Sequence, residues 1–143
     1  MKKLLVVTGL VLSSMMSYGQ DKPKDDYKIT LGVTSGVYHS TNFGGWISIG
    51  KIGVEYTKGS GKKELRSTPI DFTNIGVNYY FKKIFVGIGA QTVNTKYDNG
   101  TLPYLSVGSN YYFGNNDLCV VRGVVMTGGK GISTINLGLG VNF

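Results

Sequence analysis

His39 and Ser40 are the adjacent residues whose types come nearest to those of covalent catalysis. A hydrolase or acyltransferase needs a base beside a nucleophile, and a carboxylate usually orients the base. No acidic residue stands next to this pair, and Asp71 or Asp98 would approach it only through the fold. A loop histidine exposed to water is the simpler interpretation. We therefore predict no catalytic residue, and no motif indicates a metal or a cofactor.

Basic residues are concentrated between positions 58 and 66. Lys58, Lys62, Lys63 and Arg66 surround one acidic residue, Glu64. Such side chains pair with phosphate oxygens through charge-assisted hydrogen bonds. The segment is therefore a candidate for phosphate contact, and the alternative is a loop that is simply solvated.

The first residues have the pattern of a secretory signal peptide. Lys2 and Lys3 form a charged head, residues 4–12 form an apolar core, and residues 17–19 resemble a cleavage site of small residues. The apolar core is too short for a membrane-spanning helix, which needs about 20 residues. We expect residues 1–19 to be removed and residues 20–26 to form a polar periplasmic tail.

Charge and cysteine content narrow the classes of partner. The net charge is +7, and the exported chain keeps a positive charge after Lys2 and Lys3 are removed. An exported chain is not expected to bind nucleic acid, whereas anionic lipid headgroups suit a basic surface. The single cysteine, Cys119, excludes an internal disulfide and is interpreted as a small apolar filler.

Composition and a repeat both predict a β protein. The chain has 22 Gly and 10 Tyr, and Val, Ile, Thr and Tyr dominate its apolar segments. The segment at residues 76–81, with sequence GVNYYF, recurs at 108–113 as GSNYYF and at 140–143 as GVNF. A repeat of about 32 residues that holds two strands and two connections is typical of a β-hairpin unit.

The alternation of apolar and polar residues predicts eight strands. They cover residues 27–37, 42–49, 52–58, 70–81, 84–94, 102–113, 118–126 and 132–143. The predicted connections after the second, fourth and sixth strands are short. Those after the third and fifth strands, at residues 59–69 and 95–101, are longer. This alternation of short turns and longer loops is typical of a transmembrane β-barrel.

Aromatic residues mark the strand ends beside the short turns. They are Tyr79, Phe81, Tyr111, Phe113 and Phe143. Aromatic girdles at the two interfaces are typical of outer-membrane barrels. We therefore expect these residues, Tyr79, Phe81, Tyr111 and Phe113 together with Phe143, to form the periplasmic girdle.

The last strand carries the most specific pattern. Ile135, Leu137, Leu139, Val141 and Phe143 alternate with Asn and Gly, so one face is apolar and the other small and polar. This strand resembles the final strand of bacterial outer-membrane barrels, in which a terminal Phe is typical. The mature chain as a whole resembles the small eight-stranded barrels of the OmpA/OmpX type. The resemblance implies that Phe143 and its apolar row act as the assembly signal, read by the outer-membrane assembly machinery.

An eight-stranded barrel has an interior that side chains fill, so no wide pore is expected. The seventh strand places Arg122 among apolar residues, and arginine facing lipid would cost roughly 2–4 kcal/mol near the midplane. We therefore place Arg122 inside, although several apolar side chains must then face the lumen too. Glu55 is the other charge expected inside, and pairing of Glu55 with Arg122 is a hypothesis, the alternative being hydration near a rim.

Two other functions remain open. Gly44-Gly45-Trp46 is similar to the Gly-x-Trp of lipocalins and avidin-like barrels, which are soluble and bind a small apolar ligand; that function would turn the apolar faces inward. Enzymes that modify lipid A are also barrels, with catalytic His, Ser and acidic residues near the outer leaflet. The spacing of His39 and Ser40 is not theirs.

The sequence as a whole predicts an all-β, eight-stranded, up-and-down transmembrane barrel over residues 27–143, in the outer membrane of a Gram-negative bacterium. The expected role is structural, membrane-stabilising or interactive, without catalysis. The expected partners are membrane lipid, the assembly machinery, an unidentified protein, and lipopolysaccharide, the last through Lys58, Lys62, Lys63 and Arg66.

Overall fold

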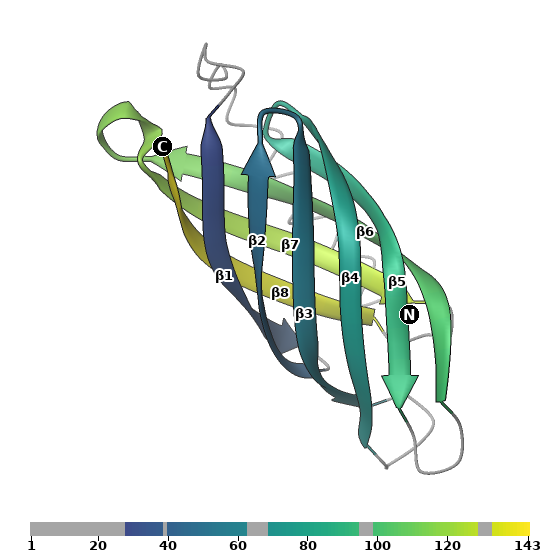
Figure 1. Ribbon diagram of the computed structural model, residues 1–143. Coiled ribbons are helices and arrows are strands. Elements are labelled where there is room, and N and C mark those ends of the chain that lie inside the picture. The colour runs from purple at the N-terminus through teal and green to yellow at the C-terminus, as the bar shows by residue number, and fades with distance from the viewer. Residues whose placement is uncertain (1–27, 39, 63–68, 95–98, 129–132) are drawn as a thin grey trace, which may run out of the picture.

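Eight antiparallel strands form one closed barrel in the computed structural model, which describes residues 28–38, 40–62, 69–94, 99–128 and 133–143. The strands are β1 (Ile29–Tyr38), β2 (Ser40–Ile49), β3 (Ile52–Lys62), β4 (Pro69–Phe81), β5 (Ile84–Asn94), β6 (Asn99–Phe113), β7 (Cys119–Gly128) and β8 (Ser133–Asn142), with a short 3₁₀ helix η1 (Asn115–Asp117). Each strand pairs with the next in sequence, and β8 pairs with β1 (Figure 1). No described helix is long and apolar enough to cross a membrane.

Alternation of side chains gives each strand an inner and an outer face. In β2, Phe43, Ile47 and Ile49 are exposed on the outside, whereas Asn42, Trp46 and Ser48 are buried. The same division continues into β3 because the register aligns Ile47 with Val54 and Trp46 with Glu55. Side chains that stand opposite in an antiparallel pair lie on the same face.

Two tight turns and η1 lie at one end of the barrel, which we call the turn end. The β2–β3 turn is Gly50-Lys51 and the β4–β5 turn is Lys82-Lys83. The first residue of each turn has a positive φ, 57° at Gly50 and 58° at Lys82. The C-terminal end of β8 lies at this end as well (Figure 1).

The expectation of eight strands in one closed barrel is confirmed, and the differences lie at the strand ends. β3 runs on to Lys62 and β6 begins at Asn99, so part of each predicted loop belongs to a strand. Gly59, Ser60 and Gly61 pair with Phe72, Asp71 and Ile70. Backbone hydrogen bonds define these pairs, so the strand extends through residues that have no apolar alternation to reveal it.

The orientation of β7 agrees with the prediction made from Arg122. Val120, Arg122, Val124 and Met126 are all buried in the interior. Val121, which alternates with them, is exposed. The interior therefore accepts an apolar row together with one charged residue.

Candidate functional site

The outer surface of the barrel is apolar around its whole circumference. Every strand contributes exposed apolar side chains at alternate positions: Ile29, Leu31, Val33, Val37, Phe43, Ile47, Ile49, Ile52, Val54, Tyr56, Ile75, Val77, Tyr79, Phe81, Val86, Ile88, Leu105, Val107, Tyr111, Phe113, Val121, Leu137 and Leu139. A soluble protein does not usually expose a continuous apolar surface of this extent. Such a surface suits a hydrocarbon solvent.

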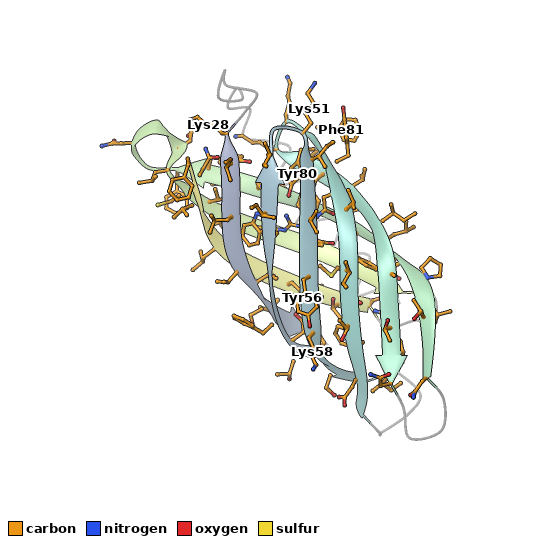
Figure 2. The ribbon with its side chains drawn as sticks, viewed as in Figure 1. Lys28, Lys51, Tyr56, Lys58, Tyr80 and Phe81 are labelled. Carbon is orange, nitrogen blue, oxygen red and sulfur yellow. The ribbon has the colours of Figure 1, made fainter. Side chains whose placement is uncertain are left out.

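The aromatic residues expected in a girdle lie together at the turn end and point outward. Tyr79, Phe81, Tyr111, Phe113 and Phe143 are all exposed. The rings of Tyr79 and Phe81 meet edge to face, with centroids 4.8 Å apart. Phe81 is seen at the turn end in Figure 2, while Tyr56 lies toward the other end.

The apolar row that begins in β8 and ends at Phe143 is only partly exposed. Leu137, Leu139 and Phe143 are exposed, while Ile135 and Val141 are half-buried. The backbone of Phe143 is fixed at the seam of the barrel, where its N–H donates to the Ile29 carbonyl over 2.8 Å and its carbonyl accepts from the Ile29 N–H over 3.1 Å.

Inside the barrel, Arg122 and Glu55 form a salt bridge. Their side chains are 1% and 2% exposed. A second guanidinium nitrogen of Arg122 donates to the Tyr80 hydroxyl oxygen at 2.7 Å. The guanidinium carbon also lies 3.9 Å from the centroid of the Phe85 ring. The charge on Arg122 is therefore met by a carboxylate, a hydroxyl and an aromatic face.

Glu55 is held from a second direction. Its other carboxylate oxygen accepts a hydrogen bond from the Tyr104 hydroxyl at 3.0 Å. Beside this carboxylate, the guanidinium carbon of Arg122 lies 4.9 Å from the centroid of the Trp46 ring. Both carboxylate oxygens are thus engaged, so Glu55 has the surroundings of a structural carboxylate rather than those of a free general base.

Glycines make room for the bulky rings that fill the interior. A Cβ atom at Gly138 would lie 2.6 Å from the Trp46 ring, and one at Gly53 would lie 2.9 Å from the Tyr80 ring. Further such pairs are Gly32 and Gly140 with Trp46, Gly76 and Gly89 with Tyr104, and Gly108 with Phe85. Ring and glycine come from different strands, so their complementarity exists only in the folded barrel.

A cluster of amides lies farther from the turn end and was missed by the sequence analysis. Asn74 and Asn136 each direct an amide nitrogen at the Met126 sulfur, at 3.6 Å. Asn42 donates to the side-chain oxygen of Asn136 at 2.9 Å, and Asn74 donates to Thr57 at 3.1 Å. The recurrence of Asn at inward positions was the available signal.

The described residues do not bring the candidate catalytic side chains together in one site. His39 and Asp98 lie outside the described residues. Ser40 belongs to β2 rather than to the predicted loop, because it pairs with Gly61 of the lengthened β3. Its hydroxyl accepts a hydrogen bond from Asn42 at 2.7 Å. Within the described ranges, no three His, Cys, Asp or Glu residues are grouped as metal ligands.

The basic segment is divided between strand and undescribed residues. Lys58 and Lys62 both belong to β3; Lys58 was expected at the end of this strand, whereas Lys62 was wrongly placed in the loop that follows it. Lys58 is exposed, and its side chain lies far from the turn end (Figure 2). Lys63 and Arg66 lie outside the described residues.

Comparison with known proteins supports the architecture. No family model matches the chain, and neither does any curated protein. Among solved structures, the chain is similar to the N-terminal β-barrel domain of Pseudomonas aeruginosa OprF, with a TM-score of 0.58 and 17% sequence identity over 87% of this chain and 100% of that domain. The chain has the fold of a small eight-stranded outer-membrane β-barrel. At this level of identity the similarity concerns the fold.

An outer-membrane-type barrel has apolar residues outside and polar residues inside, and this barrel has both. Thr30, Thr34, Ser48, Thr57, Asn78 and Ser106 are among the buried polar residues of the interior. A soluble ligand-binding barrel requires the opposite arrangement. The face assignment on which the lipocalin-like alternative depends is therefore wrong for this chain.

Proposed function

We propose that this protein is an integral outer-membrane barrel with a structural, membrane-stabilising or interaction role. One observation carries the proposal: a continuous apolar surface surrounds a closed barrel whose interior is polar and ion-paired. In hydrocarbon every backbone N–H must be paired within the protein, and closure achieves this. The packed interior favours an anchor or scaffold over a wide channel, and the engaged carboxylate of Glu55 favours a role without catalysis.

Localisation and heat-modifiability together test the proposal. Cells are fractionated, and the outer-membrane fraction is run on SDS gels with and without boiling. We expect the protein in that fraction, with a mobility that changes on boiling because a closed barrel resists detergent. Recovery as a soluble periplasmic or secreted protein would refute the membrane assignment.

The proposal includes the lipid contacts of both ends. Tyr79, Phe81, Tyr111 and Phe113 would lie at the headgroup level of the turn-side leaflet. Lys58, Lys62, Lys63 and Arg66 would meet lipopolysaccharide phosphates at the opposite end. The exposed side chain of Lys58 is consistent with this contact.

The assembly role of Phe143 is tested by Phe143→Ala. The backbone hydrogen bonds between Phe143 and Ile29 do not depend on the ring, so we expect the purified variant to refold into detergent like the parent. In cells we expect less heat-modifiable protein in the outer membrane, because the assembly machinery would read the ring. Leu105→Ala, at an exposed apolar position of β6 outside this row, is the control for lost apolar area. Equal cellular levels of parent and Phe143→Ala would contradict an assembly signal at this residue.

A further inference from the structure

Lysine occupies the same structural position in three of the four hairpin units. The residue immediately before each odd-numbered strand is Lys28, Lys51, Lys83 and Leu118. In each case the carbonyl accepts a hydrogen bond from the neighbouring even-numbered strand or its end: from Gly50 at 3.2 Å, Tyr80 at 2.9 Å, Asn110 at 2.8 Å and Asn142 at 2.8 Å. The four positions therefore lie at one level around the turn end.

Lys28, Lys51 and Lys83, together with Lys82 in the β4–β5 turn, form what we call the lysine collar. Lys28 and Lys51, and likewise Lys51 and Lys83, are separated by two strands, which is roughly 10 Å, and Lys82 is adjacent to Lys83 in the same turn. Lys51 and Lys82 are exposed, and the side chains of Lys28 and Lys51 lie at the turn end (Figure 2). Of the residues the structure describes, Glu55, Asp71 and Asp117 carry carboxylate side chains, and among these Asp117 belongs to the turn end. Among the described residues, the charged side chains at the turn end are thus mostly lysines, of which Lys51 and Lys82 are exposed.

Lys83 connects the collar to the aromatic girdle. Its ammonium nitrogen lies 5.3 Å from the centroid of the Tyr111 ring, and this ring is exposed on the outer surface. The same nitrogen is buried and has no hydrogen-bond partner within the described part of the chain. An ammonium group has three donors, so this one is positioned at the girdle with donors unused. This buried charge faces the Tyr111 ring, while Lys51 and Lys82 carry the exposed ammonium groups of the collar.

We propose that the lysine collar binds the phosphate groups of anionic phospholipids, of the phosphatidylglycerol type, in the leaflet at the turn end. This inference rests on the proposed membrane function. Exposed aromatic side chains lie at the headgroup level of a bilayer, and Tyr111 and Phe81 place the collar just beyond that level. Lysines near an anionic lipid surface are attracted to it, and the attraction is additive over several residues. The barrel would thereby gather anionic lipid on one side of the membrane.

The test is a titration that resolves positions along the chain. The full chain is folded in zwitterionic dodecylphosphocholine micelles, and its amide chemical shifts are followed as short-chain phosphatidylglycerol is added. Short-chain phosphatidylcholine and inorganic phosphate are titrated in parallel. We expect saturable shifts at Lys51, Lys82, Lys83 and Tyr111 with phosphatidylglycerol, weaker ones with the other two probes, and little response at Asp71 near the opposite end of the barrel.

Matched variants separate the collar from the general positive charge of the chain. Lys51→Gln removes a charge at the turn end, whereas Asp71→Asn removes an exposed charge near the start of β4, at the opposite end of the barrel. We expect Lys51→Gln to weaken the apparent affinity for phosphatidylglycerol up to about fivefold, Lys51→Gln with Lys83→Gln to weaken it further, and Asp71→Asn to leave it unchanged. Added salt should weaken the response of the parent.

Three results would overturn the proposal: equal shifts with phosphatidylcholine, an equal response to inorganic phosphate, or an unchanged affinity in Lys51→Gln. Lys51 is exposed in a turn, so its variant is expected to fold, which the gel-mobility change verifies. A protein that resides in the outer membrane but shows no preference for phosphatidylglycerol would refute the collar alone. A protein found soluble on fractionation would refute the membrane function on which the collar depends.

Discussion

Arg122 carries a charge in the interior of the barrel, where it is 1% exposed. Its partners come from four other strands: Trp46 from β2, Glu55 from β3, Tyr80 from β4 and the Phe85 ring from β5. Removal of one member of a buried pair leaves a charge without compensation, whereas removal of both members can be nearly neutral. Loss of one member of the pair should therefore destabilise the barrel more than loss of both.

We predict that Glu55→Gln lowers the free energy of unfolding by about 3–5 kcal/mol, because Arg122 would remain buried without a counter-charge. The double variant Glu55→Gln/Arg122→Met should recover most of this loss. Urea unfolding in lipid vesicles, followed by gel mobility, measures both values. Lys58→Gln, which removes an exposed charge, is the control and should change little. A double variant as unstable as the sum of the two single variants would contradict the pairing.

Gly138 tests the fit between glycines and rings at the same scale. An added Cβ would lie 2.6 Å from the Trp46 ring, so we predict that Gly138→Ala lowers the free energy of unfolding by about 1–3 kcal/mol through overpacking. The cost should be smaller in a Trp46→Leu background, where the ring is absent. A double-mutant cycle measured by urea unfolding gives this coupling. An equal cost in both backgrounds would show that the ring is not the obstacle.

At the scale of the element, the two hairpin turns differ in the type of residue that adopts a positive φ. Gly50 and Lys82 are the first residues of equivalent two-residue turns and share almost the same φ. Glycine adopts this left-handed region freely, whereas a residue with a Cβ pays about 1–2 kcal/mol. The β4–β5 turn therefore carries strain that the β2–β3 turn avoids.

We predict that Lys82→Gly raises the free energy of unfolding by up to about 1 kcal/mol, the relief of strain being partly offset by the greater freedom of glycine in the unfolded chain. Lys83→Gly is the matched control, because Lys83 has no positive φ; it should be destabilising. Urea unfolding of the two variants makes the comparison. A loss of stability in both would show that the turn is not strained at Lys82.

At the scale of the whole molecule, the barrel reverses the usual distribution of side chains in a soluble protein, because many apolar side chains face outward and many polar ones face inward. Ile88, near the middle of β5, is 63% exposed, while the polar residues Asn74, Asn78 and Asn110 are fully buried. In water this arrangement would aggregate, whereas in a bilayer the apolar surface is satisfied by lipid. Closure through β1 and β8 removes the unpaired strand edges.

The reversed preference predicts a dependence on depth. Ile88→Arg should cost about 2–4 kcal/mol, because the charge would lie near the bilayer midplane, whereas Asn94→Arg at the exposed end of the same strand should cost about 0–1 kcal/mol. Reversible folding into phosphatidylcholine vesicles measures both. Equal costs at the two positions would indicate that the β5 exterior does not cross a membrane.

The sequence by itself was sufficient for the number of strands, their outward faces and the inward placement of Arg122. These features follow from alternation, which is a local property, and from the high cost of arginine in lipid. The expected barrel is confirmed in its closure and strand order. The ends of β3 and β6 were placed wrongly because backbone pairing extends past the last apolar residue.

Only the tertiary structure decided which interior residues meet. Arg122, Glu55, Tyr80 and Tyr104 come from four strands, and their contacts depend on the register of every strand pair between them. The same is true of Gly138 beneath Trp46 and of Lys83 over Tyr111. Alternation assigns a residue to a face, but the partner across a barrel is set by register and closure, which no single strand encodes.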